Sequence, residues 1–472
     1  MTTTLISGAT VVNADGRQPA DILICDGKIA ALAEPGTVTD ADEVIAADGQ
    51  FALPGVIDVH VHFRDPGMTH KEDWLTGSQA AALGGVTTVF DMPNTVPPVD
   101  TVDHFRLKAA EAEAKCIVDY GIYGLLGEHN LDQLDALADA GVIGFKLFLG
   151  NTTGDLPCPS DGAVLEGFEI LARSGLRCSI HAENSPILFW RQNRMKAAGR
   201  TDPYAHLAAR TDVVAVEALT RSAVLAEWTG ARIHIVHESC AASIPYIQWF
   251  KSRGVDMTVE TLPQYLYLSA EEMLEPGGHI LRMNPPIRQK SHQEPLWSAL
   301  LDGTIDMLST DHAPHAVDEK DGDTIWDMAC GFPGVQTSLP LMLHAVSQGR
   351  MTLEDIARVM SAAPARAFGL FGRKGVLRVG ADADIALVDP SAAHQISAAG
   401  LASRGKLTPY DGWTVKGNVR RTLVRGQTVA MDGKVVADPG CGQMVRPQMP
   451  PAAPRNTATT TEAIQSPDNR PW

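Results

Sequence analysis

The feature that most constrains the fold is an alternation of short apolar runs with longer amphipathic stretches through the middle of the chain. The apolar runs have strand character, and the stretches between them, such as DHFRLKAAEAEAKC, have helix character. The strand-like runs lie at 55–63, 84–92, 141–149, 177–183, 231–239, 255–262 and 305–313. Repeated β-then-α units favour a parallel sheet, and seven or eight of them favour a closed (β/α)8 barrel of the TIM type. An open, doubly wound sheet is the alternative that this pattern leaves.

Both ends of the chain have a different sequence pattern from the middle. Residues 4–55 and 375–440 contain short β-like segments separated by turns such as Asp-Gly. Two such stretches around a long middle predict one small β-sandwich domain built from both chain ends. We expect residues 1–54 and 375–446 to form this sandwich and residues 55–374 to form the barrel. Residues 447–472 are rich in Pro, Thr and small polar residues, which predicts a flexible tail; an arm packed on a neighbouring subunit is the alternative.

Charge and cysteine usage exclude several classes of protein. The chain has 39 basic and 56 acidic residues, a net charge of −17, which would repel nucleic acid or an anionic membrane. Its seven cysteines are scattered and never spaced as CxxC, which argues against a disulfide scaffold and a structural zinc site. No basic leader precedes an apolar run, and no apolar stretch approaches the roughly 20 residues of a membrane-spanning helix. We therefore expect a cytoplasmic protein without nucleic-acid or membrane partners.

A pair of histidines ends the first barrel-type strand, in the order Val59-His60-Val61-His62. Side chains two residues apart on a strand point the same way, so His60 and His62 are able to share one metal ion. For an HxH pair taken alone, two structural histidines are the better interpretation. The motif therefore needs support from elsewhere in the chain.

That support comes from polar residues that recur at the ends of later apolar runs. His181, His237 and Asp311 each follow a strand-like run, and Lys146 lies within one. In a barrel these strand ends converge on one mouth, where active sites of this fold are found. Burial lowers the pKa of a lysine, freeing an amine that can act as a nucleophile or take up carbon dioxide as a carbamate. A lysine reaching solvent from a strand end is the alternative for Lys146 taken alone.

The order HxH, Lys, His, His, Asp resembles the amidohydrolase superfamily, and within it the branch of dihydroorotases, allantoinases and hydantoinases. The resemblance covers nearly the whole chain, through ALPGVIDVHVHFRDPG, AALGGVTTVFDMPNT, GFKLFLG, STDHAPH and SAAPARAFGLFGRKGVLRVGADADIALVD. It implies a binuclear metal-dependent hydrolase of a small cyclic amide. It also implies a homodimer or homotetramer. Some relatives bind aspartate transcarbamoylase, but no residue of this chain indicates whether it does so too.

The resemblance also implies a set of metal ligands. His60 and His62 would bind one divalent ion together with Asp311, His181 and His237 would bind the second, and carboxylated Lys146 would bridge the two. Such nitrogen and oxygen ligands suit zinc, although manganese or cobalt can substitute. Asp311 would be the catalytic acid and base, moving a proton from the attacking water to the leaving amide nitrogen.

Two positions match dihydroorotases in particular. These enzymes carry an Arg two residues after HxH and the sequence MPNT after the second strand; here these are Arg64 and Met92–Thr95. By resemblance, Arg64 and Asn94 would bind the carboxylate of dihydroorotate with help from His315, and Asn284 would line the pocket. A guanidinium forms a bidentate pair with a carboxylate, which a lysine does not reproduce. We therefore predict a dihydroorotase, interconverting dihydroorotate and N-carbamoyl-L-aspartate in pyrimidine biosynthesis.

Other features keep alternatives open. The segment ETLPQYLYL is more similar to hydantoinases and allantoinases, whereas hydantoinases carry a Tyr where this chain has Asn151. An allantoinase or a hydantoinase-like (dihydropyrimidinase-like) enzyme is therefore the first alternative. A non-catalytic scaffold relative would not be expected to keep all six metal-binding residues, and a single-ion deaminase would lack the bridging lysine.

Overall fold

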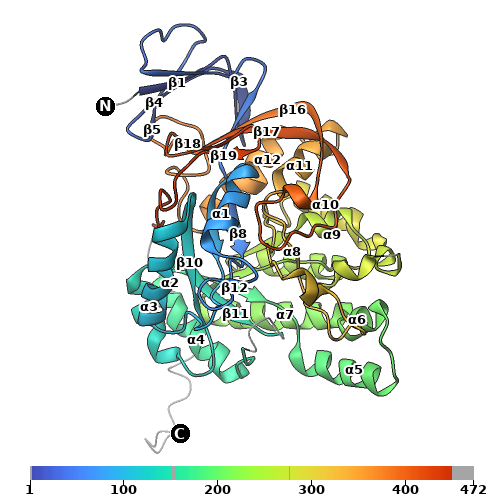
Figure 1. Cartoon of the computed structure of the whole chain (residues 1–472). Coiled ribbons are helices and arrows are strands. Elements are labelled where there is room, and N and C mark those ends of the chain that lie inside the picture. Colours follow the sequence, from blue (N-terminus) through green and yellow to red (C-terminus); the bar gives the residue numbers. More distant parts are fainter. Residues whose placement is uncertain (1–2, 151–155, 276, 449–472) are drawn as a thin grey trace, which may run out of the picture.

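The computed structural model describes residues 3–150, 156–275 and 277–448, and it contains a parallel barrel with a β-sandwich at one end (Figure 1). The barrel strands follow sequence order in one sheet. They are β8 (Val56–Val61), β9 (Val86–Asp91), β10 (Asp119–Leu125), β11 (Gly144–Phe148), β12 (Arg177–His181), β13 (Arg232–Ile235), β14 (Met257–Thr261) and β15 (Met307–Leu308). Almost every residue of these strands is buried, because helices cover the outside and side chains fill the inside.

The barrel closes between its first and last strands. Val61 forms a parallel bridge with His312, and the backbone N–H of His62 donates to the carbonyl of His312 at 2.8 Å. This closure excludes the open, doubly wound sheet and confirms the predicted TIM-type barrel.

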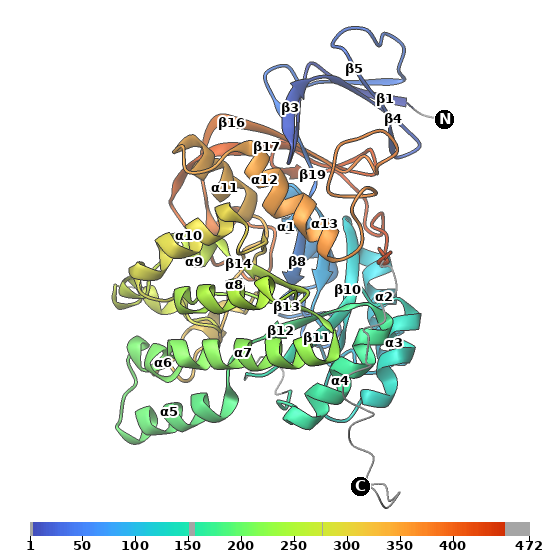
Figure 2. The same ribbon diagram turned by 180° about the vertical axis from the view of Figure 1, so that it is seen from behind.

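The helices that cover the barrel begin and end at residues typical of helix caps. Asp73 caps α1 by accepting the N–H of Thr76, and Gly230 ends α7 in a left-handed conformation. The covering helices are α1 (Trp74–Leu83), α2 (Val102–Lys115), α3 (Leu134–Ala140), α4 (Asp161–Ser174), α7 (Asp212–Thr229), α8 (Ile244–Ser252), α10 (Gln293–Asp302) and α11 (Ser338–Ser347). Shorter or inserted helices are α5 (Ser185–Ala197), α6 (Pro203–Ala209), α9 (Pro263–Tyr267), α12 (Leu353–Ala357) and α13 (Ala363–Ala367). Figure 2 shows α5 and α6 projecting at the end of the barrel opposite the sandwich.

Two sheets form the sandwich, and the second of them contains strands from both chain ends. The four-stranded sheet has the order β5-β4-β1-β6, from β1 (Thr3–Ser7), β4 (Asp21–Cys25), β5 (Lys28–Ala33) and β6 (Glu43–Ala46). The seven-stranded sheet has the order β19-β18-β17-β16-β7-β2-β3. Its strands are β2 (Thr10–Asn13), β3 (Gly16–Pro19), β7 (Phe51–Pro54), β16 (Ile385–Gln395), β17 (Thr414–Val424), β18 (Gln427–Met431) and β19 (Lys434–Val435).

The two sheets share one apolar core, which contains Ile6 and Ile22 from the first sheet and Ile385 and Leu423 from the second. Strand β7 pairs antiparallel with β16, so the sheet joins the two chain ends directly. The prediction of a small β domain built from both ends is therefore confirmed. Its boundaries stay a prediction, and residues 449–472 of the predicted tail lie outside the described residues.

A buried ionic cluster ties the barrel to the C-terminal strands. The ammonium of Lys374 lies 2.6 Å from Asp119 at the start of β10, and it also contacts Asp384 at the start of β16. The guanidinium of Arg425 contacts the other oxygen of Asp119. Lys374 is 1% exposed and Asp119 is fully buried. Opposite charges compensate one another here, as burial requires.

Among the described residues, no helix is both long and apolar enough to cross a membrane. All seven cysteines are free thiols.

Candidate metal centre and active site

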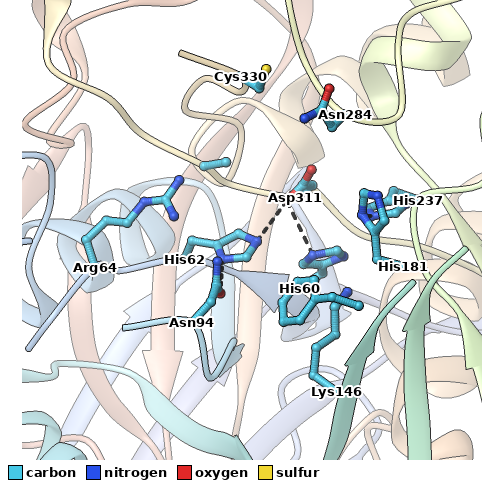
Figure 3. A pocket seen from close by; sticks show the side chains of 12 residues that line it. His60, His62, Arg64, Asn94, Lys146, His181, His237, Asn284, Asp311 and Cys330 are labelled. Carbon is cyan, nitrogen blue, oxygen red and sulfur yellow. Dashed lines mark hydrogen bonds and ion pairs between the residues drawn. The ribbon is translucent and has the colours of Figure 1, made fainter. Parts of the chain in front are cut away.

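Six predicted ligand residues line one pocket at the C-terminal mouth of the barrel. His60 lies on β8 and His62 just beyond it, Lys146 lies on β11, His181 ends β12, and His237 and Asp311 follow β13 and β15. All six are buried. Figure 3 shows these side chains arranged around Asp311, with Lys146 approaching from below. The structure therefore brings together residues from distant parts of the sequence, as the barrel hypothesis predicts.

One group of possible ligands forms around Asp311. Its Oδ1 lies 3.3 Å from Nε2 of His60 and 3.1 Å from Nε2 of His62 (Figure 3). The two histidines thus present the same nitrogen to the same carboxylate, as expected for residues at alternate positions of a strand end. This geometry suits one cation held by two imidazoles and a carboxylate.

A second group lies beside the first. Nδ1 of His181 is 2.9 Å from Nε2 of His237, so both nitrogens point to a common region. One ligand atom each from His60, His237 and Asp311 lies within 4.8 Å of the others, which places the two groups next to each other. These separations permit two neighbouring cations.

Lys146 has no hydrogen-bond partner among the described residues, although its ammonium nitrogen is buried. Burial lowers the pKa of Lys146 to about 8, so far more of the amine is neutral near neutral pH than in an ordinary lysine. An unpartnered buried amine is costly and calls for a group that satisfies it. Nδ1 of His237 is likewise buried without a partner. Together with the convergent nitrogens, these atoms fit a metal centre.

The backbone at this mouth adopts a conformation that non-glycine residues seldom take. Arg64, His237 and Asp311 have φ angles of 62°, 42° and 46°. Such left-handed residues cost about 1–3 kcal/mol each and cluster at functional sites, where the surrounding structure holds them. In this barrel the turn redirects each side chain from the strand end into the pocket.

The predicted substrate-binding residues have different positions. Arg64 and Asn284 line the pocket; Nη1 of Arg64 and Oδ1 of Asn284 are buried without hydrogen-bond partners among the described residues. Asn94 also lines the pocket, and its Oδ1 lies 2.9 Å from Nδ1 of His62, so it orients that histidine. His315 lies behind Arg64, 3.5 Å from its Nη2, and its Nε2 faces the carbonyl of Cys330.

Sequence reasoning missed several residues of the site. Phe148 and Cys330 line the pocket, and Glu260 and Glu183 hold the outer nitrogens of His60 and His181. A charged residue within the apolar run VDMTVETL is the signal that could have revealed Glu260. Arg288 does not line this pocket; it is buried and pairs with Asp212 at 2.9 Å.

Comparison with known proteins places this chain in a family. The model of the amidohydrolase family matches residues 51–429. An allantoinase of Deinococcus radiodurans is 38% identical over 447 residues, covering 94% of this chain and 98% of that protein. An L-hydantoinase of Paenarthrobacter aurescens is 35% identical over 446 residues, covering 93% of this chain and 97% of the relative. This chain belongs to the amidohydrolase family.

Solved structures agree with this placement. The L-hydantoinase (dihydropyrimidinase) of Arthrobacter aurescens superposes with a TM-score of 0.92 at 35% identity, covering 94% of this chain and all of that one. A D-hydantoinase superposes with a TM-score of 0.88 at 31% identity, covering 95% of this chain and 99% of the other. The expectation of a cyclic amidohydrolase with allantoinase and hydantoinase relatives is confirmed. The narrower prediction of a dihydroorotase gains no support, because these relatives are named allantoinase or hydantoinase.

Proposed function

We propose that this protein is a binuclear metal-dependent hydrolase that opens a cyclic ureide of the allantoin or hydantoin type. The observation that carries the proposal is the convergence of His60, His62, His181, His237 and Asp311 around the buried, unpartnered amine of Lys146. The names and whole-chain similarity of the relatives support the substrate class.

The chain's own residues would hold the ions in two sets. His60, His62 and Asp311 would bind one, and His181 and His237 the other. Carbon dioxide would add to the neutral amine of Lys146 with release of a proton, giving a carbamate whose two oxygens reach both ions. Zinc suits these ligands. The bound ions would polarise the scissile carbonyl. They would also lower the pKa of a water molecule, so that it could lose a proton and attack that carbonyl.

Asp311 would move the proton that ring opening requires. Its carboxylate lines the pocket, and its Oδ1 lies 3.3 Å from Nε2 of His60 and 3.1 Å from Nε2 of His62. It would accept a proton from the attacking water and donate it to the ring nitrogen as the C–N bond breaks. The other pocket walls position the ring: Phe148 supplies an apolar surface, and Asn284 supplies an amide for the ureide.

A second candidate function is dihydroorotate hydrolysis, and Arg64 is the observation that favours it. Arg64 is 2% exposed and lines the pocket, and its Nη1 has no hydrogen-bond partner in the described part of the chain. A substrate carboxylate would satisfy that nitrogen with a charge-assisted hydrogen bond. In an allantoin-type substrate, a carbonyl oxygen would occupy the same place.

One parallel assay tests both candidates. The purified protein, supplied with zinc and bicarbonate, is incubated with allantoin, hydantoin, dihydrouracil and dihydroorotate, and the loss of each ring is followed by absorbance. We expect turnover of allantoin or hydantoin well above that of dihydroorotate, and a turnover number about 10²–10⁴-fold lower in the Asp311→Asn variant. Preferred turnover of dihydroorotate would establish the second candidate instead. Absence of turnover with every ring in a protein that holds two ions would refute both.

A further inference from the structure

Glu260 occupies an unusual position beneath the proposed metal centre. It lies on β14 and is fully buried, yet its carboxylate does not line the pocket. Its Oε1 lies 2.6 Å from Nδ1 of His60 and accepts the backbone N–H of His237 at 3.0 Å. Its Oε2 lies 3.0 Å from Nε2 of His234. One carboxylate thus contacts residues of both proposed ion sites.

The contact with His60 determines which nitrogen faces the pocket. An ionised carboxylate only accepts hydrogen bonds, so the proton of a neutral His60 must lie on Nδ1. This leaves the lone pair of Nε2 facing Asp311, where a cation would bind. A carboxylate at the outer nitrogen also makes an imidazole more basic and fixes its ring plane.

The contact with His237 acts through the backbone. His237 has a φ angle of 42°, and the hydrogen bond to Glu260 stabilises its strained turn. A second hydrogen bond stabilises the same turn, because the backbone N–H of Glu238 donates to the backbone carbonyl of Glu260 at 2.8 Å. Loss of the carboxylate would free the turn that directs the His237 ring toward His181.

Glu183 provides a contrast within the same site. Its Oε2 lies 2.9 Å from Nε2 of His181 and also contacts the buried guanidinium of Arg210. It therefore fixes the orientation of one histidine of one proposed ion site. Among the described residues, no hydrogen bond or ion pair joins Glu183 to His60, His62 or Asp311.

We propose that Glu260 is a positioning residue shared by the two ion sites, so that its loss weakens both ions together, whereas loss of Glu183 weakens only the ion at His181 and His237. This inference rests on the proposed function, because it requires two ions. It assigns no chemical step to Glu260. It explains why a carboxylate is fully buried on this barrel strand.

The test measures metal content and affinity in addition to activity. The holoenzyme and its Glu260→Gln, Glu183→Gln and Glu238→Gln variants are dialysed against a chelator concentration at which the natural protein keeps both ions. Zinc per chain is then measured by mass spectrometry. Glu238→Gln is the matched control, because Glu238 is a buried glutamate beside His237 whose Oε1 accepts the N–H of Cys240 and no proposed ligand. Outer carboxylates of this kind alter metal affinity by roughly 10–100-fold.

We expect two ions in the natural protein and the control, about one in Glu183→Gln and fewer than one in Glu260→Gln. Circular dichroism of the apo-proteins reports folding. If the Gln variant does not fold, Glu260→Asp replaces it in the test, because it keeps the charge but withdraws it by one methylene. Two ions bound with natural affinity in folded Glu260 variants would overturn the inference. So would loss of one ion only, or equal loss in the control. A natural protein that binds no metal would instead refute the proposed function.

Discussion

Replacing Arg64 with methionine separates the two candidate substrates. Methionine keeps an apolar stem of similar length and removes the guanidinium that lines the pocket. A hydrogen bond from the charged guanidinium to a neutral carbonyl contributes about 1.5–3 kcal/mol, whereas removing one partner of a buried ion pair costs about 3–5 kcal/mol because the other charge stays uncompensated. By RT of about 0.59 kcal/mol, these ranges correspond to about 13- to 160-fold and about 160- to 5,000-fold in affinity.

We therefore expect Arg64→Met to weaken binding of dihydroorotate, as substrate or competitive inhibitor, by about 160-fold or more. KM for an uncharged hydantoin should rise by about 13- to 160-fold. Steady-state kinetics with hydantoin, and inhibition by dihydroorotate, give both values from one preparation. The control is Arg288→Met, which removes a buried guanidinium that pairs with Asp212 outside the pocket. Equal weakening of the two ligands by Arg64→Met would refute carboxylate recognition by Arg64.

Three further perturbations test the centre and the fold. Lys146→Ala should lose zinc and activity, with partial rescue by a short-chain carboxylic acid that fills the space left by the carbamate; full activity in the variant would exclude a bridging role. Asp311→Asn should keep most of its metal, measured by mass spectrometry, while kcat falls by about 10²–10⁴-fold, the contribution of a positioned acid and base; a change in KM alone would contradict the proton-transfer role. Lys374→Met leaves Asp119 and Asp384 short of compensating charge, so the free energy of unfolding in urea should fall by about 3–5 kcal/mol. The exposed Lys434→Met should change it by less than about 0.5 kcal/mol, and equal values would show that the buried cluster contributes nothing.

The sequence predicts the barrel and the polar residues that meet at its mouth because both depend on short-range regularities. Apolar runs report buried parallel strands, and a polar residue at the end of such a run is conspicuous. His181, His237 and Asp311 are found in this way without knowledge of any contact. The short strand-like segments at the chain ends likewise predict a β domain. The pairing of β7 with β16, however, is a long-range contact that no local pattern specifies.

The residues that escaped prediction act through contacts across the barrel. Glu260 and Glu183 lie in or next to strands, but only the fold brings them to the outer nitrogens of His60 and His181. Cys330 reaches the pocket from a loop with no regular periodicity. The dihydroorotase prediction, which gains no support from the relatives, shows a related difficulty. Arg64 and Asn94 match a dihydroorotase motif, yet Asn94 bonds to His62, so the motif partly reports the orientation of that histidine. The Asn151 position lies outside the described residues and leaves that comparison a prediction.

The placement of β7 has a consequence for how the chain matures on the ribosome. This strand precedes the barrel, but one of its two neighbours, β16, is synthesised only after the barrel. At translation rates of about 5–20 residues per second, the N-terminal sheet waits on the order of tens of seconds with an unpaired edge. Such an edge is a template for pairing with other nascent chains. Truncations before residue 395 should therefore accumulate as aggregates even when every metal-binding side chain has been made.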